Sequence, residues 1–383
     1  MSPTSRRALA IVLVLGCTHE ASTPTGAIAL VADRCSDPVC ASQPQTVPVS
    51  DTIALGPLVV ATYDGSGQAV HPDVAITPEG WGTSRLHLAL TPYPYGDQSF
   101  ENPSLYASAD AATWIAEPGI ANPIARSSPE TGYLSDPALV YVPERRELWM
   151  YYRRVKLVND VLLVRSGDGV HWSEPTPVAS APNHLLISPT VVHRSAGEWA
   201  MWSVAANDGC ISVRTTVERR TSRNGFAWSP PRQVDLPVPA GLMAWHIHVM
   251  WVPTEGRYWA LYNAKEGTNC ATRALYLATS EDGLSWTSYP APLLSAGDLP
   301  VFSTIVYRSC MVYDAARDRV WFWLSGAGPD ALGQLSWRIA ALSLPRTAVL
   351  ERVSRAAPAY RPAPPSRRYP GFVEGGDLRR KLP

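Results

Sequence analysis

The sequence carries no net charge, no metal-ligating cluster and no sustained helical period. Its 383 residues include 33 basic and 33 acidic side chains, which balance to a formal charge of zero. Nothing in this balance suggests a nucleic-acid surface, and we expect no nucleic-acid partner. No CxxC pair or His-rich cluster has metal-ligand spacing, so we predict no metal site. The missing helical period favours an all-β fold.

Phenylalanine is also scarce, whereas the other aromatic residues are abundant, with Phe 5 against Trp 14 and Tyr 16. Trp and Tyr combine an apolar ring with a polar group. They suit stacking on sugar rings, but a β repeat also uses such rings as core. The aromatic balance leaves both interpretations open. Hydrophobic residues make up 46% of the chain, which is enough for a sizeable core.

One short pattern, S-x-D/N-G-x-x-W, occurs three times, and a degenerate copy precedes it. Its tryptophans are Trp114, Trp172, Trp228 and Trp286, which are 58, 56 and 58 residues apart. A period of this length, built from strands and tight turns, is typical of the radial blades of a β-propeller. Asp-Gly favours a two-residue hairpin turn because its backbone tolerates positive φ, and we expect the Ser to bond to the turn backbone.

A second repeated element, an apolar strand introduced by polar residues, lies upstream of these turns. Its five copies begin at His71, Asp136, Ser188, His246 and Arg308. An aromatic and β-branched strand follows each copy. Five inner strands predict a five-bladed β-propeller over residues 51–350, and a six-bladed ring is the alternative. Residues 51–63 have no repeat of their own, and we predict that they pair with the last blade and close the ring.

The two ends of the chain lie outside the repeats. Two arginines and a short apolar stretch precede residues 14–17 (Val-Leu-Gly-Cys), which resemble a bacterial lipobox. We predict a signal peptide at 1–16, lipidation of Cys17, a flexible tether at 17–50 and attachment to the cell envelope by lipid alone. An ordinary secretory signal with an incidental cysteine is the alternative. Residues 351–383 are rich in Pro and Arg and predict an extended tail.

Export permits disulfide bonds between the remaining cysteines. Cys35 and Cys40 are close enough in sequence to close a small loop. Cys210 and Cys270 follow equivalent strands of neighbouring repeats, so they could bridge two blades. Cys310 is left over, and we predict that it is buried.

The polar residues that introduce the inner strands are the strongest indication of a functional site. In a propeller the innermost strands line a central channel, and their starts open on one face. We therefore expect the five residues named above to converge, although they lie far apart in the sequence. The alternative is that they only satisfy strand ends and water in the channel.

Inner strands introduced by Asp-Pro, together with the S-x-D-G-x-x-W hairpins, resemble the five-bladed glycosidases of the arabinanase, xylosidase and fructosidase superfamily (families 43, 32, 117 and relatives). The resemblance covers roughly residues 51–345. The segments at His71, Phe100, Ser135 and Trp245 are similar to a poorly characterised bacterial and phage branch of glycosidase-like proteins. The resemblance implies a glycoside hydrolase that acts by metal-independent water attack on a glycan in the channel.

Hydrolysis of a glycoside usually needs a carboxylic acid to protonate the leaving oxygen and a carboxylate to activate water. In family 43 a blade-one Asp is the base, a blade-two Asp orients the site and a blade-three Glu is the acid. By position, Asp136 corresponds to the blade-two Asp. His71 stands where the blade-one Asp is expected, and blade three has Ser188 and no Glu.

We therefore predict Asp136 and Glu101 as the carboxylate pair, with His71 and His246 as their catalytic partners. A histidine tuned near neutral pH can move a proton, and one is proposed to do so in family 117. The alternative for Glu101 is a structural turn acid. The predicted substrate-binding residues are Asp73, Asn102, Ser188, Trp245, His248 and Arg308. We expect no cofactor, although the resemblance leaves Ca²⁺ in the channel open.

Two other classes of function remain at this stage. The first is a propeller that binds carbohydrate or cell-wall material without cleaving it, because the hydrolase acid has been lost. The second is a protein-binding propeller, since this fold often serves as an interaction disc. The predicted partner is a glycan or oligosaccharide, and the chain is predicted to be a monomer.

Overall fold

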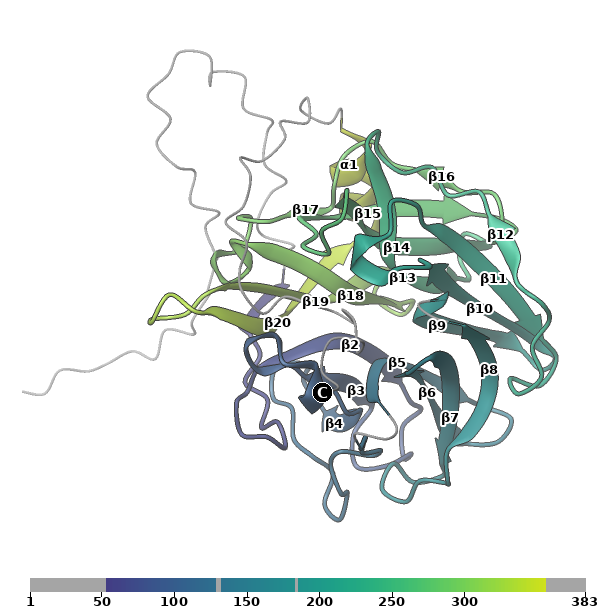
Figure 1. Cartoon of the computed structure of the whole chain (residues 1–383). Coiled ribbons are helices and arrows are strands. Elements are labelled where there is room, and N and C mark those ends of the chain that lie inside the picture. The colour runs from purple at the N-terminus through teal and green to yellow at the C-terminus, as the bar shows by residue number, and fades with distance from the viewer. Residues whose placement is uncertain (1–52, 129–131, 183–184, 356–383) are drawn as a thin grey trace, which may run out of the picture.

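The computed structural model describes residues 53–128, 132–182 and 185–355 (Figure 1). The predicted signal peptide, tether, lipidation site at Cys17 and Cys35–Cys40 pair lie outside these residues, as does most of the predicted tail. Within the described residues, no helix is long and apolar enough to cross a membrane.

Five antiparallel sheets surround a central axis, so the predicted five-bladed β-propeller is confirmed (Figure 1). Blade 1 contains β2 (Ala69–Ile76), β3 (Leu86–Pro92) and β4 (Ser104–Ser108), with the short 3₁₀ helices η3 (Pro94–Gly96) and η4 (Gln98–Phe100). Blade 2 contains β5 (Tyr133–Val142), β6 (Glu147–Val155), β7 (Val158–Ser166) and β8 (Thr176–Pro182). Blade 3 contains β9 (Leu185–Ser195), β10 (Glu198–Ala205), β11 (Thr216–Ser222) and β12 (Arg232–Val234), with η5 (Gly209–Ile211).

Blade 4 contains β13 (Leu242–Val252), β14 (Arg257–Glu266), β15 (Ala274–Ser280), β16 (Thr287–Ser288) and β17 (Leu294–Ser295). Blade 5 contains β18 (Ile305–Asp314), β19 (Arg319–Pro329) and β20 (Leu335–Pro345), preceded by η6 (Pro300–Phe302). Its fourth strand is β1 (Ile53–Pro57), which pairs antiparallel with β20. The first described strand therefore closes the ring, as predicted, and covers an edge that β20 would otherwise expose.

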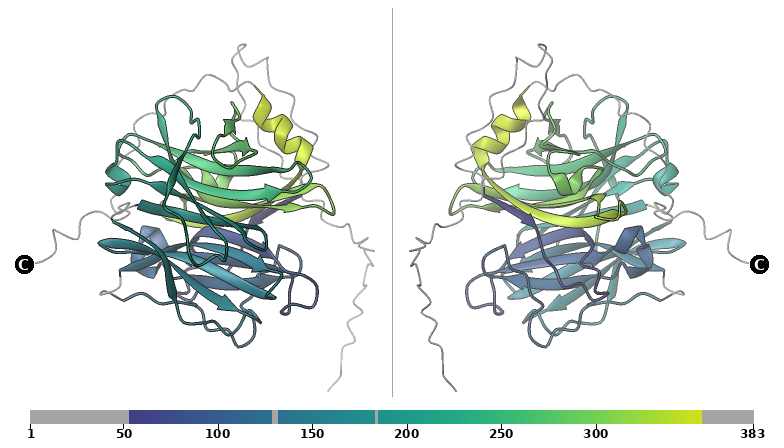
Figure 2. Two further views of the ribbon diagram at one scale, coloured as in Figure 1. Left: turned by 90° about the vertical axis from the view of Figure 1, so that its right-hand side faces the viewer. Right: turned by 90° about the vertical axis from the view of Figure 1, so that its left-hand side faces the viewer.

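A helix that the sequence did not predict follows the last strand. Helix α1 (Arg346–Ser354) lies along the outer side of blades 4 and 5 (Figure 2), where Arg352 donates a 2.6 Å hydrogen bond to the carbonyl of Leu293. Its buried side chains include Val349 and Val353, which pack into the core between these blades. Residues 351–354, which we assigned to the extended tail, therefore form the end of a helix.

The S-x-D/N-G-x-x-W segments form compact loops rather than the predicted two-residue turns. In blade 3, Ser222 bridges to Trp228 and leaves residues 223–227 between them. The Asn224 Oδ1 atom accepts hydrogen bonds of 2.9 Å from two later backbone N–H groups. Ser222 Oγ accepts a 3.0 Å hydrogen bond from the N–H of Gly225, as expected for the Ser. The side chains thus close a loop wider than the sequence indicated.

Each of these loops packs against an aromatic side chain of the preceding blade. The Tyr151 hydroxyl of blade 2 donates a 3.0 Å hydrogen bond to the carbonyl of Gly225, and Trp202 Nε1 of blade 3 donates a 2.8 Å bond to that of Gly283. We call these two contacts the rim clamps. Gly225 has φ +76°, and a Cβ atom there would lie 2.6 Å from the Trp149 ring, so only glycine fits. Aromatic residues therefore serve largely as contacts between blades.

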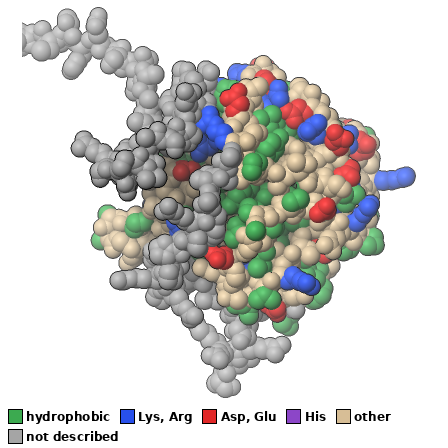
Figure 3. Space-filling view, turned by 90° about the horizontal axis from the view of Figure 1, so that it is seen from above, with side chains coloured by type: hydrophobic (Ala, Val, Ile, Leu, Met, Phe, Trp, Pro, Cys, Tyr) green, Lys and Arg blue, Asp and Glu red, His purple; other side chains and the backbone are tan. Residues whose placement is uncertain are grey.

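The predicted disulfide between Cys210 and Cys270 is present and joins the β10–β11 connection of blade 3 to the β14–β15 connection of blade 4. Cys310 is a free, buried cysteine. Acidic and basic side chains are interspersed on the side of the molecule seen in Figure 3, in keeping with the balanced charge.

Candidate functional site

The inner strands of blades 1 to 3 turn one polar side chain each toward the axis by the same backbone device. His71, Asp136 and Ser188 have φ values of 55°, 52° and 51°, which L-residues rarely adopt. Each precedes a proline, and the strand register shifts at each position. Proline has no N–H to donate, so the ladder is interrupted there and the strand bulges. Strained backbone is often found at functional sites, and here it occurs at three equivalent positions. The end of the channel where these residues lie is therefore the candidate site.

Asp136 is the anionic centre of the axial cluster. Its Oδ1 atom lies 3.6 Å from His71 Nε2, 3.8 Å from Arg308 Nε and 3.9 Å from His246 Nδ1. Its Oδ2 atom accepts a 3.0 Å hydrogen bond from Arg153 Nη1. Burial alone would raise the pKa of Asp136, but its neighbours, including the guanidinium cations of Arg153 and Arg308, hold it well below its ordinary range. Asp136 is therefore ionised.

His71 lies between two carboxylates. Its Nε2 faces Asp136, and its Nδ1 lies 3.6 Å from Glu101 Oε2 and 3.2 Å from Thr91 Oγ1. Glu101 follows η4 in the β3–β4 connection, on the face where the inner strands begin. His71 is 1% exposed and Glu101 is fully buried. Burial lowers the pKa of His71 to about 4, so its imidazole is neutral at physiological pH.

His246 is a second neutral imidazole in the cluster. Burial lowers its pKa well below the ordinary value. The Ser188 hydroxyl contacts His246 Nδ1 and lies 3.4 Å from Asp136 Oδ1. A serine nucleophile relay needs the serine and the aspartate on opposite ring nitrogens, whereas here both approach Nδ1. The arrangement therefore does not match a Ser-His-Asp triad.

A second group of charged side chains, centred on Asp73, lies further along the axis. Asp73 Oδ2 is 3.5 Å from Arg308 Nη2 and 3.6 Å from His248 Nε2. Burial raises the pKa of Asp73 to about 7, although Arg308 acts in the opposite direction. Burial also lowers the pKa of His248 to about 3. Arg308 thus bridges two carboxylates, because its Nε also approaches Asp136.

The structure brings most of the predicted site residues together but places two of them elsewhere. Asn102 donates a 2.7 Å hydrogen bond to the Tyr63 hydroxyl and accepts one of 2.6 Å from the Ser127 N–H, so it holds the rim of blade 1. Trp245 is 1% exposed and packs edge-on behind His246, with ring centres 5.5 Å apart. It is a core residue, and its ring is not available to stack on a sugar.

Two residues of the cluster were not predicted. Arg153 comes from β6, the second strand of blade 2, and its signal in the sequence is a charged residue inside an aromatic strand. The ring of Tyr307 lies 4.4 Å from that of His246 and 5.5 Å from that of His71, measured between centres, and holds both imidazoles in place. Across the described ranges, no group of three or more His, Cys, Asp or Glu side chains could hold a metal ion.

Comparison with known proteins identifies glycan-acting relatives of this fold. No family model matches the chain. In an alignment of 308 positions that covers 67% of this chain, the chain is 29% identical to the A type blood N-acetyl-α-D-galactosamine deacetylase of Flavonifractor plautii, and the match spans 40% of that protein. The crystal structure of an N-acetylgalactosamine deacetylase from F. plautii, in complex with blood group B trisaccharide, has a TM-score of 0.71 at 24% identity, covering 79% of this chain and 97% of that one.

Propeller glycosidases are also structural neighbours. An α-L-arabinofuranosidase from Podospora anserina, in complex with cellotriose, has a TM-score of 0.54 at 14% identity, covering 76% of this chain and 96% of that one. The predicted resemblance to five-bladed glycosidases is therefore confirmed at the level of the fold. The same scaffold also carries a deacetylase, so the fold leaves the reaction to be argued from the site.

Proposed function

We propose that this protein hydrolyses the N-acetyl group of an amino-sugar residue in a glycan, using the axial cluster. The observation that carries the proposal is the neutral imidazole of His71, which lies 3.6 Å from a carboxylate at each ring nitrogen. The similarity to a glycan deacetylase over 67% of the chain supports the choice of an amide as the bond that is cleaved.

In this reaction His71 accepts a proton from water, and the water oxygen attacks the acetyl carbonyl carbon. The imidazolium that forms is attracted by the ionised Asp136, which offsets part of the effect of burial on His71. The cation of Arg308 supplies positive charge near the carbonyl oxygen as it becomes negative. When the C–N bond breaks, the imidazolium returns its proton to the leaving amine, and acetate departs from a free amino sugar.

Hydrolysis of a glycosidic bond is the second candidate, and one observation favours it. Glu101 and Asp136 meet at a single imidazole ring, so a carboxylate pair is present at one place. The pair has only one member that can serve as an acid, because Asp136 is held ionised by its cationic neighbours. The blade-three position holds Ser188 rather than a carboxylic acid. Hydrolysis of an amide needs no separate carboxylic acid of this kind, because the imidazolium of His71 can protonate the leaving amine.

Product analysis separates these reactions. We expect the purified protein to release acetate from oligosaccharides that end in N-acetylgalactosamine or N-acetylglucosamine, and to leave the glycosidic bonds intact. The His71→Gln variant should lower kcat for acetate release by about 10²–10⁴-fold, because it removes the proton acceptor. The matched control is His171→Gln, which changes a histidine on an exposed loop and should leave kcat unchanged.

Other products would decide against deacetylation. Release of reducing sugar without acetate would support the glycosidase. Saturable glycan binding with neither product would support the non-catalytic, carbohydrate-binding propeller.

We also propose that the protein is exported and attached to a membrane through lipid on Cys17. The basic and apolar start of the chain and its lipobox-like segment support this, and the Cys210–Cys270 disulfide suits an oxidising compartment. Metabolic labelling with an alkyne fatty acid should mark the wild-type protein and not the Cys17→Ala variant. Equal labelling of both would refute the anchor.

A further inference from the structure

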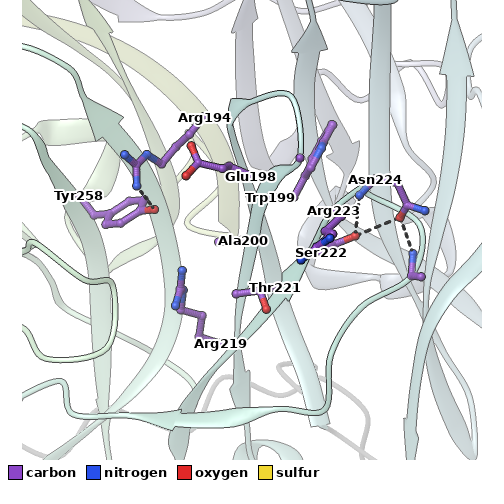
Figure 4. Close-up of a pocket in the computed structure, with 12 residues that line it drawn as sticks. Arg194, Glu198, Trp199, Ala200, Arg219, Thr221, Ser222, Arg223, Asn224 and Tyr258 are labelled. Carbon is purple, nitrogen blue, oxygen red and sulfur yellow. Dashed lines mark hydrogen bonds between the residues drawn. The ribbon is translucent and has the colours of Figure 1, made fainter.

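A separate hollow is lined by residues of blade 3 and by Tyr258 of blade 4 (Figure 4). Its volume is about 560 Å³, and its lining includes Arg194, Arg219, Arg223, Thr221 and Tyr258. Strand β9 begins beside the axis near Ser188 and ends at Ser195, next to this hollow. The hollow is therefore on the opposite face of the disc from the start of the inner strands.

The hollow is lined by arginines that lack acidic partners. Among the described residues, no carboxylate lies within ion-pair distance of Arg194, Arg219 or Arg223. Two acidic side chains lie nearby, and one of them, Glu198, lines the hollow. Glu198 accepts a 2.7 Å hydrogen bond from the Ser195 hydroxyl, and Glu281 lies 3.7 Å from Arg257. With three arginines and one carboxylate, Glu198, in its lining, the hollow carries an excess of positive charge on a protein whose net charge is zero.

Aromatic rings fix two of these guanidinium groups. The Arg194 guanidinium lies 3.9 Å from the centre of the Trp251 ring, and that of Arg219 lies 5.4 Å from the centre of the Trp202 ring. Stacking occupies the face of a guanidinium and leaves its N–H edge available. Figure 4 shows both groups on either side of the Tyr258 hydroxyl, to which Arg194 Nη1 donates a long, 3.5 Å hydrogen bond. The Nε of Arg219 is buried and makes no hydrogen bond among the described residues.

We propose that this hollow binds the anionic group of an acidic saccharide, a uronate carboxylate or a sulfate ester. Fixed guanidinium edges match the paired oxygens of both groups. The volume is within the range of small-ligand sites, and the exposed Thr221 hydroxyl is placed to meet neutral sugar hydroxyls. The site lies on the face opposite the axial cluster, so it would hold a glycan chain independently of the reaction proposed there.

Calorimetric titration with three oligosaccharides of matched length tests this assignment: an oligouronate, a sulfated oligosaccharide and a neutral one. We expect binding of at least one acidic ligand, weakening with added salt, and no comparable binding of the neutral one. The double variant Arg194→Gln/Arg219→Gln should weaken it by about tenfold or more. The single variant Arg194→Gln, at an exposed position, should give a smaller loss in the same direction.

The control is Arg232→Gln, an exposed arginine on β12 of the same blade that lies outside the hollow. It should bind as the wild type does. An equal loss of affinity in this control would mean that acidic ligands are held by diffuse charge attraction, and it would refute the proposed site. Equal binding of the neutral ligand, or no binding of either acidic one, would also overturn it. Acetate release from a short neutral substrate should be unchanged in the double variant, so this test can fail or succeed independently of the proposed deacetylase.

Discussion

The axis and the rim of this propeller are held together by different forces. At the axis, the opposite charges of Arg308 and Asp136 are buried and stabilise each other. Apolar side chains in their place would remove the charges of the candidate site. At the rim, the clamps at Gly225 and Gly283 join blades by aromatic packing and single hydrogen bonds. Residues of the axis therefore contribute to stability and, in the reaction proposed above, to chemistry, whereas residues of the rim contribute to stability alone. Substitutions in each region should separate these two roles.

The largest effect is expected at the axis for Arg308→Gln. This change leaves Asp73 and Asp136 without the cation that lies between them. Removing one partner of a buried ion pair typically costs about 3–5 kcal/mol, and we expect a loss of that size in the free energy of unfolding. Acetate release per folded molecule should fall as well. Chemical denaturation and activity assays on the same preparation check both effects.

A second substitution tests whether charge is the cause. In the double variant Arg308→Gln/Asp73→Asn, one of the two orphaned carboxylates is neutralised. We expect the double variant to be more stable than Arg308→Gln alone, because the two sites are directly coupled. If the losses in free energy of unfolding caused by Arg308→Gln and Asp73→Asn simply added, Arg308 would act through packing. The axis would then not differ from the rim in the force that stabilises it.

At the rim, Gly225→Ala should cost about 2–4 kcal/mol of stability, through overpacking and a left-handed φ. The added Cβ would meet the Trp149 ring at 2.6 Å. The matched control is Gly197→Ala, since Gly197 has φ +84° but nothing within 4 Å of its Cβ position. The difference in free energy of unfolding between the two variants measures the contribution of the rim clamp at Gly225. Activity per folded molecule should be that of the wild type in both, and a fall in Gly225→Ala alone would link rim to axis.

The axis should also give the protein an unusual dependence of stability on pH. The folded pKa of Asp73 is raised to about 7 from an ordinary 3.8, so its contribution is fully present below pH 3.8 and is lost as the pH rises through 7. The folded pKa of His71 is lowered to about 4 from 6.5, so its contribution is present above pH 6.5 and is lost as the pH falls. The two groups oppose each other between about pH 4 and 6.5.

Asp73→Asn removes one side of this balance. We expect the variant to lose stability more steeply than the wild type as the pH is lowered from 7 to 4, because the histidines then act unopposed. Urea denaturation at several pH values measures the slope. Parallel curves for variant and wild type would contradict the raised pKa of Asp73. Gly225→Ala, at the rim, should shift the curve without changing its slope.

The sequence predicts the axis better than it predicts the connections. The repeat places one polar residue per inner strand at equivalent positions, so the meeting of His71, Asp136 and His246 follows from the period alone. The pairing of Cys210 with Cys270 follows in the same way. Glu101 could be selected as a candidate, but not its position against His71 Nδ1. The conformation of its irregular connection depends on contacts such as the 2.6 Å bond from the Tyr63 hydroxyl to the Phe100 carbonyl.

Other misses have equally local reasons. Arg153 lies on a second strand, where alternation predicts a face of the sheet but not the depth along the axis. Trp245 was predicted to bind substrate, yet its ring is buried behind His246 at a register shift of the strand. Helix α1 is short, and its buried residues are too few to show a period in the sequence.

The smallest expected effect concerns the left-handed backbone at the axis. Pro137 follows Asp136 and restricts the unfolded chain, so Pro137→Ala should cost about 1 kcal/mol of stability. Because Asp136 is then less firmly held, kcat should fall too. Pro177→Ala, at an exposed position on β8, is the rim control and should lower stability slightly without changing kcat. If both variants kept the wild-type kcat, the proline would serve folding alone, and the Asp136 carboxylate would be positioned by Arg153 and Arg308 rather than by its backbone.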